Sequence, residues 1–250
     1  RVVLVHGGGP QSTEMAEALG LSTEIIQGRR VTDESALDVA AMVLNGQINT
    51  RILAACRELD VPAIGISGVD GGLICASRRP PVQIDGGESD PVDFGFVGDI
   101  ESVDVDVLRT QLDNGLVPII SPLSADSNGT LLNINADTVA AALAAALNAE
   151  KLILVTSAPG ILENPSDPGS LVSYLDLSGL QRLRDANALE SGMLPKATAI
   201  EAAIEGGVPR VHVISYRVPD SLLLEIFTNE GTGTLIVETI GELTAAEQAH

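Results

Sequence analysis

Short apolar runs alternate with amphipathic stretches along most of the chain. Residues 2–7, VVLVHG, predict a buried strand, and residues 12–20, STEMAEALG, have the spacing of a helix that ends at a glycine. Residues 33–59 predict a long helical stretch with Asp33 as its N-cap. The same reasoning predicts further strands at 62–67, 96–103, 116–123, 151–158, 210–215 and 233–238, and further helices at 104–115, 138–149, 177–189, 196–207 and 220–228.

This alternation is typical of an open, largely parallel sheet with helices on both faces. The region from Gly71 to Gly95 is rich in glycine, proline and aspartate, which predicts hairpins and a mobile loop. The chain has 250 residues, enough for one large α/β domain or two closely packed lobes. We expect the lobes at residues 1–150 and 151–250.

Composition and charge exclude several classes of partner. Aromatic residues make up 2% of the chain and tryptophan is absent, so the core must be aliphatic and stacking platforms for single-stranded nucleic acid are lacking. The formal net charge of −20 disfavours contact with nucleic acid and with anionic lipid. No apolar run reaches the length of a membrane span. We therefore expect no nucleic acid and no membrane as partners.

Lysines and cysteines are few. Lys151 and Lys196 are the only lysines among 14 cationic residues, so each is a candidate for a specific role. Cys56 and Cys75 stand apart, without a CxxC or a His/Cys cluster, which predicts neither a metal site nor a disulfide and fits a reducing cytoplasm. Arg1 stands inside a strand pattern, so we expect further residues upstream of it.

Three consecutive glycines, Gly7–Gly9, separate the first predicted strand from the first predicted helix. Glycines in this position offer backbone N–H groups and a helix N-terminus to an anion, because only glycine lets the backbone come so close. The pattern is neither G-x-G-x-x-G nor G-x-x-x-x-G-K-[ST]. A purely structural turn is the alternative interpretation.

Other polar residues stand at predicted helix starts. Arg30, in QGRRVTD, carries a fork-shaped guanidinium that matches a carboxylate, with a solvated surface arginine as the alternative. Asn133, Asn135 and Asp137, in LLNINADT, lie where a strand runs into a helix, and helix capping is the more frequent explanation there. Lys196 follows Gly-Met-Leu-Pro and is either a phosphate contact or a surface lysine.

Together these motifs form a recognisable pattern. The segments HGGGPQ, GRRVTD, MVLNGQIN, GISGVDGG, GFVGDI, LNINADTVA and SGMLPKATA, in this order and spacing, closely resemble the acetylglutamate kinases of the amino acid kinase family. The resemblance runs from Val2 to about Glu238. It implies a three-layer α/β/α sandwich with a mainly parallel open sheet. It also implies transfer of a phosphoryl group from ATP, with Mg²⁺, to the side-chain carboxylate of an N-acylglutamate in arginine biosynthesis.

The resemblance implies roles for residues of the first lobe, which would bind the acyl amino acid. Gly8 and Gly9 match glycines whose N–H groups donate to the reacting oxygens, as in an oxyanion hole. Arg30 and Asn133 match residues that bind the substrate's α-carboxylate and its surroundings. Asp137 matches the aspartate that organises the catalytic groups.

The second lobe would bind the nucleotide. Lys196 matches a lysine that neutralises charge on the transferring phosphate. By the same resemblance, the end of the strand at 151–158 and the segment that follows it line the nucleotide site, at Thr156, Ser157, Gly160, Ile161 and Leu162.

Two departures leave alternatives open. Ser157 stands where the family has an aspartate, and the family's N-terminal Lys-x-Gly-Gly segment is not in this sequence. One alternative is a kinase for an acylated aminoadipate, which the segment GRRVTD disfavours. Another is a catalytically weak regulatory homologue. The sequence does not distinguish acetyl from succinyl as the acyl group.

The segment LLLEIFTNEGTGT resembles arginine-inhibited members of the family. Glu225 and Gly231 match positions of their arginine site, whereas Asp220 stands where a histidine is usual. The stretch from Asp33 to Ile66 has more apolar residues than one sheet face needs, and this lobe forms a twofold dimer in the family. We therefore expect a homodimer or a higher homo-oligomer, with arginine binding accompanied by a hexamer.

Overall fold

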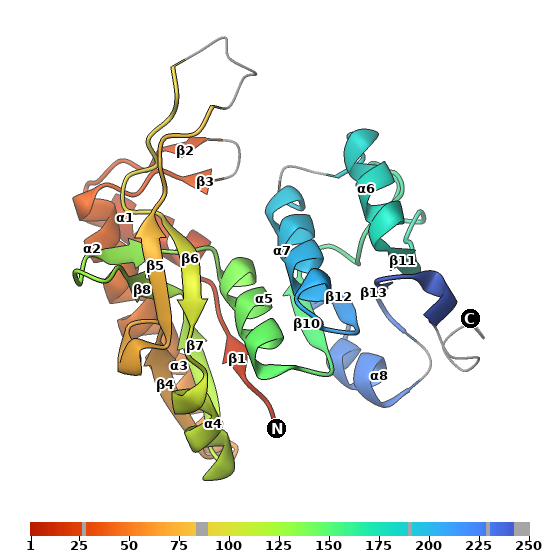
Figure 1. Ribbon diagram of the computed structural model, residues 1–250, viewed down its shortest axis with the longest axis horizontal. Coiled ribbons are helices and arrows are strands. Elements are labelled where there is room, and N and C mark those ends of the chain that lie inside the picture. Colours follow the sequence, from red (N-terminus) through yellow and green to blue (C-terminus); the bar gives the residue numbers. More distant parts are fainter. Residues whose placement is uncertain (27–28, 84–89, 190–191, 229–230, 243–250) are drawn as a thin grey trace. The chain divides into compact units, whose positions relative to one another are not determined.

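The computed structural model describes residues 1–26, 29–83, 90–189, 192–228 and 231–242 (Figure 1). Its internal contacts divide the chain into two compact units, Arg1–Val139 and Ala140–His250. The division falls within a helix and before residue 150. Each unit is described separately.

The first unit begins with a strand, a glycine turn and a helix, and continues as an α/β arrangement. Its elements are β1 (Leu4–Val5), α1 (Gly9–Ala18), β2 (Ile25–Ile26), β3 (Arg29–Arg30), α2 (Glu34–Ala41), η1 (Met42–Ile48), α3 (Asn49–Glu58), β4 (Ala63–Ser67), η2 (Asp70–Gly72), β5 (Ile74–Arg78), β6 (Gly98–Val103), α4 (Asp106–Asp113), β7 (Val117–Ser121), β8 (Leu123–Ala125), β9 (Leu131–Asn133) and the start of α5 (Ala136–Leu147).

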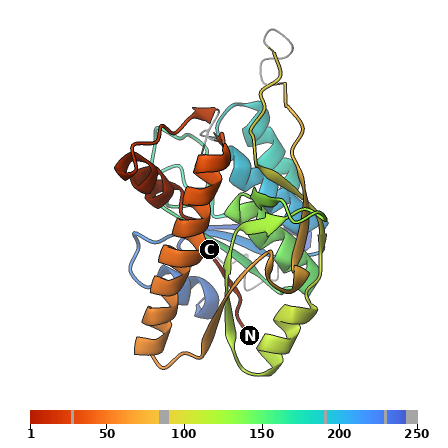
Figure 2. The ribbon, with the colours of Figure 1, turned by 90° about the vertical axis from the view of Figure 1, so that its left-hand side faces the viewer.

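A parallel sheet in the order β1-β7-β4 lies at the centre of this unit. The side chains of Ile119 and Ile120 on β7 are fully buried, as expected of a strand covered on both faces. Figure 2 shows the rod formed by α2, η1 and α3 along one side of the strands and α4 on the other. A second sheet has the order β6-β5-β8-β9, and β2 and β3 form an antiparallel hairpin.

The rod differs from the single helix that the sequence predicts for residues 33–59. Asp33 does cap its start, because its carboxylate accepts from the N–H of Ala36 at 2.7 Å. The seven residues of η1, however, are π-helical. A π-helical turn holds an extra residue and is frequent at functional sites.

In the second unit a four-stranded sheet has the order β10-β12-β13-β11. β10 pairs with β12 and β11 with β13 in parallel, while β12 and β13 are antiparallel. The elements after α5 are β10 (Leu152–Thr156), β11 (Tyr174–Asp176), α6 (Leu177–Asp185), α7 (Leu194–Glu205), β12 (Val211–Ser215), α8 (Ser221–Phe227), β13 (Thr234–Val237) and η3 (Ile240–Glu242).

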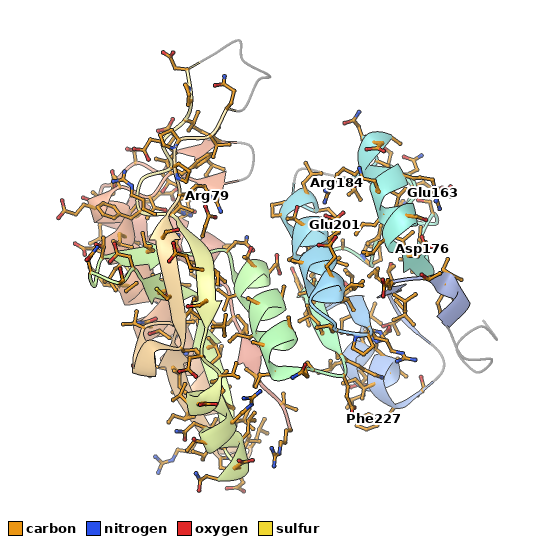
Figure 3. The ribbon with its side chains drawn as sticks, viewed as in Figure 1. Arg79, Glu163, Asp176, Arg184, Glu201 and Phe227 are labelled. Atoms are coloured by element: carbon orange, nitrogen blue, oxygen red, sulfur yellow. The ribbon has the colours of Figure 1, made fainter. Side chains whose placement is uncertain are left out.

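Helix α7 supplies much of the aliphatic core of this unit, with Ala197, Ile200 and Ala203 fully buried. A salt bridge of 2.8 Å between Arg184 on α6 and Glu201 on α7 joins the two helices (Figure 3). The segment expected to bind the nucleotide begins at Thr156, the last residue of β10.

The predicted strands and helices all have counterparts in the structure, and the mainly parallel α/β architecture is confirmed. The sequence analysis missed the β2–β3 hairpin and β11. The hairpins expected between Gly71 and Gly95 are present, because β5 pairs with β6 in antiparallel fashion and Val82 bridges to Val92; residues 84–89 of that region lie outside the described residues. In the part of the chain that the structure describes, no helix is long and apolar enough to cross a membrane.

Candidate active site

The glycine turn between β1 and α1 has two different glycines at its end. A Cβ on Gly8 would lie 2.5 Å from Cδ1 of Ile48 and 2.7 Å from Cδ2 of Leu44, so η1 packs directly on this residue. A Cβ on Gly9 would meet no atom within 4 Å. Gly8 is therefore required for packing, whereas Gly9 opens onto free space at the first residue of a helix, where anions bind.

The guanidinium of Arg30 lies against this turn. Its Nη2 donates to the carbonyl oxygen of Gly9 at 3.1 Å and to Oγ1 of Thr13 at 2.6 Å, and its Nη1 donates to Oγ1 of Thr23 at 3.0 Å. Burial lowers the pKa of Arg30 from its usual value, but a guanidinium keeps its proton at neutral pH. A positive charge is thus held beside the N-terminus of α1.

A pocket of about 80 Å³ adjoins Arg30. The α1 side, the following loop and the start of α2 line it, with Ser12, Ser22, Thr23, Asp33 and Ser35 among its polar residues. The hydroxyl contacts of Thr13 and Thr23 with Arg30 were not anticipated. The only sequence signal for Thr13 and Thr23 is that both follow the glycine turn and precede the hairpin that contains Arg30.

Asn133 lies next to the segment that follows Arg30. Its Nδ2 donates to Oγ1 of the buried Thr32 at 3.4 Å, and its backbone N–H donates to the carbonyl of Phe96 at 2.8 Å. Asn133 therefore contacts a residue two positions after Arg30 in the chain.

Helix α5 begins beside the same turn. Oδ1 of Asn135 accepts from the N–H groups of Asp137 and Thr138 at 2.9 and 3.2 Å, so Asn135 is the capping residue of this pair. A Cβ on Gly7 would lie 3.7 Å from Cβ of Ala136. Asp137 therefore stands in the first turn of a helix that packs on the glycine turn.

In the second unit, the segment after β10 is bound into the sheet. Thr156 is the last residue of β10, and the carbonyl of Ser157 accepts from Oγ of Ser215 at 3.5 Å. The N–H of Ile161 donates to Oγ1 of Thr234 at 2.8 Å, and the Ile161 side chain is fully buried in the core. The segment continues through Gly160, where a Cβ would lie 2.6 Å from Cδ1 of Leu171, and Leu162, which forms a bridge with Leu171.

Lys196 lies in the first turn of α7, directly after Pro195. Its side chain is half-buried, whereas Lys151, the other lysine, is exposed. The contact of Lys196 with a phosphate stays a prediction.

Glu225 and Gly231, the residues proposed for arginine, lie close together. A Cβ on Gly231 would be 3.6 Å from Oε2 of Glu225. The Glu225 carboxylate is buried, accepts from Nδ1 of His212 at 2.7 Å and from the N–H of Thr232 at 2.9 Å. Burial raises the pKa of Glu225, but these hydrogen bonds outweigh it, so the net pKa lies below its ordinary value. Asp220 is exposed and has φ 56° at the start of α8.

A model of the amino acid kinase family matches residues 1–215. An acetylglutamate kinase from Myxococcus xanthus is 50% identical over 240 residues, which cover 95% of this chain and 78% of that protein. An acetylglutamate kinase from Archaeoglobus fulgidus is 43% identical over 234 residues, with 94% and 81% covered. The chain belongs to the amino acid kinase family and, within it, to the acetylglutamate kinases.

A solved relative is named for a different activity. N-acetylglutamate synthase from Neisseria gonorrhoeae, complexed with coenzyme A and N-acetyl-glutamate, has a TM-score of 0.79 and 33% identity over 96% of this chain. This chain spans 52% of that synthase chain. The same synthase has also been solved with coenzyme A and L-arginine.

Proposed function

We propose that this protein transfers the γ-phosphoryl group of ATP to the side-chain carboxylate of N-acetyl-L-glutamate in arginine biosynthesis. The observation that carries the proposal is the Arg30 guanidinium lying on the carbonyl of Gly9. An acceptor with two carboxylates needs a cation for one and N–H donors for the other. In this proposal Arg30 and Asn133 bind the α-carboxylate.

The reacting carboxylate lies at the glycine turn. Phosphoryl transfer requires alignment and charge stabilisation more than covalent chemistry from the protein. The N–H groups of Gly8 and Gly9 would donate to the oxygens on which charge develops, and Asp137 would orient the groups around them. Gly9 suits this role because the space beside it is open.

We assign the nucleotide to the second unit, with Thr156, Ser157, Gly160, Ile161 and Leu162 around it and Lys196 on its phosphates. The buried side chain of Ile161 restricts that residue to shaping the site from beneath. In this assignment residues 1–150 are the acyl-amino-acid lobe and residues 151–250 the nucleotide lobe.

Magnesium would be held by the nucleotide. Among the described residues, no group of three or more His, Cys, Asp or Glu side chains is placed to bind a metal ion. Mg²⁺ keeps several waters and is commonly bound through substrate phosphates. When bound, it would neutralise charge on the phosphate oxygens.

Assembly and control complete the proposal. Met42 on the rod of the first unit and Leu59 directly after it are 55% and 74% exposed, which supports a homodimer through this lobe. Arginine is proposed as an inhibitor bound at Glu225 and Gly231, in a higher homo-oligomer. Calorimetry tests the binding of arginine, and light scattering tests the oligomeric state.

The free cysteines Cys56 and Cys75 agree with a cytoplasmic enzyme.

The activity test traps the acyl phosphate product with hydroxylamine and measures the hydroxamate. We expect ATP-dependent product with N-acetyl-L-glutamate and less with N-acetyl-L-aminoadipate or N-succinyl-L-glutamate. More product with the aminoadipate derivative would overturn the substrate assignment. No product from any of the three would leave the regulatory homologue as the function.

A further inference from the structure

A buried histidine and a buried asparagine lie directly beneath the glycine turn. His6 follows β1 and is 7% exposed, and Asn49, the first residue of α3, is 5% exposed. Nδ2 of Asn49 donates to the carbonyl of Ile119 at 2.9 Å and lies 3.3 Å from Nε2 of His6. The substrate-binding and phosphate-binding roles described above use neither residue.

The chain leaves space for this asparagine. A Cβ on Gly65 of β4 would lie 2.0 Å from Oδ1 of Asn49, so no side chain fits at that position of the strand while Asn49 keeps its place. Asn49 thus occupies the space above β4 and connects β7 with the histidine after β1. Such a close fit indicates that its orientation is fixed.

The contacts determine which ring nitrogen of His6 carries the proton. Nδ1 lies 3.0 Å from the carbonyl oxygen of Gly7, which only accepts, so Nδ1 must donate. Nε2 then accepts from the amide of Asn49. Burial lowers the pKa of His6, which favours this neutral form at physiological pH.

The direction of the Gly7 carbonyl determines the direction of the next N–H. In a planar trans peptide, the C=O of one residue and the N–H of the next point in opposite directions. Because the Gly7 carbonyl points to the His6 ring, the Gly8 N–H points away from it. Within the described residues, this N–H has no hydrogen-bond acceptor.

We propose that His6, oriented by Asn49, is a positioning residue that fixes the Gly7–Gly8 peptide so that the Gly8 N–H faces the transferring phosphoryl group. This inference rests on the proposed function, in which that N–H stabilises the transition state. His6 contacts neither substrate nor nucleotide in this scheme and acts only through the peptide.

The π-helical segment η1 explains how one element supports both parts of this arrangement. Leu44 and Ile48 of η1 contact Gly8 from the side, and Asn49 follows immediately. Removing the extra residue of a π-helical turn would rotate everything after it by about 100° around the helix axis. Asn49 would then face away from His6 while Leu44 stayed in place.

Two substitutions at His6 separate positioning from packing. His6→Asn places an amide N–H where Nδ1 stands, whereas His6→Gln places its amide near Nε2. We expect kcat to stay within about threefold of wild type in His6→Asn and to fall about 10- to 100-fold in His6→Gln, with both KM values nearly constant. Equal kcat in the two variants would overturn the proposal.

A stability control accompanies them. Val105→Ala removes buried volume next to α4, away from the turn, and we expect it to lower stability without lowering kcat. A kcat loss in Val105→Ala as large as in His6→Gln would mean that lost stability explains the effect, and the proposal would be wrong.

The wild-type protein offers a test that needs no activity. Long-range ¹H–¹⁵N spectra distinguish the ring nitrogens, and the His6 signals are assigned by their loss in His6→Asn. We expect a protonated Nδ1 and an unprotonated Nε2 at neutral pH. A protonated Nε2 would overturn the inference even in an active enzyme, whereas absent hydroxamate formation with the expected tautomer would refute only the proposed function.

Discussion

Two glycine-containing loops, one in each unit, lie next to buried histidines but are bound in opposite ways. In Gly7–Gly9, the neutral ring of His6 donates to a backbone carbonyl. In residues 231–233, a backbone N–H donates to the Glu225 carboxylate, which His212 holds from the other side. The first loop therefore turns an N–H outward, and the second turns one inward.

The difference shows that glycine content alone does not make an anion site. The buried partner decides which end of the peptide faces the ligand, because C=O and N–H are opposed in the same plane. A hydrogen-bond donor beneath the loop binds its carbonyl groups and leaves its N–H groups facing the ligand. A carboxylate beneath the loop binds the N–H groups instead. A loop organised around an anionic side chain is suited to a cation, which agrees with the arginine proposed at Glu225.

The largest expected effect is on kcat and tests whether the N–H groups of the loop at Gly7–Gly9 suffice for phosphoryl transfer without a cation. Lys196→Ala should lower kcat by about 10²–10³, because the N–H donors of the first unit cannot replace a cation on the phosphate. Steady-state kinetics measure the loss, and a urea unfolding curve should shift little. Lys151→Ala, at the exposed second lysine, is the matched control with unchanged kcat. Wild-type turnover in Lys196→Ala would remove the lysine from the mechanism.

The second prediction concerns the inward-facing loop. Glu225→Leu leaves Nδ1 of His212 and the N–H of Thr232 without their acceptor, and should lower the free energy of unfolding by about 3 kcal/mol. The lowered pKa of Glu225 means that its contribution is complete above the ordinary pKa and is lost as pH falls through the folded-state pKa.

The measurement is urea unfolding of wild type and Glu225→Leu at neutral and acidic pH. The gap between the two proteins should narrow in acid, because wild type then loses the same charged acceptor. A gap that is small at neutral pH, or that widens in acid, would contradict the role given to this carboxylate.

The third prediction concerns the binding of the acyl amino acid by Arg30, beside the loop at Gly7–Gly9. Arg30→Lys replaces a planar fork with a point charge, so the contacts of Nη2 with Gly9 and Thr13 cannot be kept together with the contact of Nη1 with Thr23. We expect KM for the acyl amino acid to rise about tenfold, equivalent to about 1.4 kcal/mol, with KM for ATP nearly unchanged. Equal increases in both KM values would point to a purely structural arginine.

The sequence predicted the elements better than it predicted the directions within them. The apolar runs identified β1 and β7 because buried parallel strands are continuously apolar. The cap at Asp33 followed from its side-chain chemistry. The π-helical turn in η1 was missed, because its seven residues contain too few repeats of the apolar pattern to reveal the change of face that one extra residue causes.

The candidate site rests on motifs that the sequence displays, at Gly8, Gly9, Arg30 and Asn133. The roles of these four residues stay predictions. His6 and Asn49 were missed because their contact joins residues far apart in the chain. The available signals were a histidine at the end of an apolar strand and a glycine, Gly65, within a strand that lacks any turn.

The smallest expected effect concerns the protonation of His6. The pKa of His6 is lowered in the folded protein, so between that value and the ordinary 6.5 the unfolded chain binds a proton that the folded chain does not. Stability due to His6 is therefore complete above pH 6.5 and is lost as pH falls below it. Asn at this position cannot titrate.

Wild type should consequently lose about 1 kcal/mol more than His6→Asn when the pH is lowered from about 7.5 to about 5.5. Urea unfolding at the two pH values measures the difference, and the groups common to both proteins cancel in the comparison. Parallel losses in the two proteins would mean that His6 takes up a proton in the folded state. It could not then accept from Asn49 through Nε2. The contrast drawn above between the loop at Gly7–Gly9 and the loop at residues 231–233 would then be wrong.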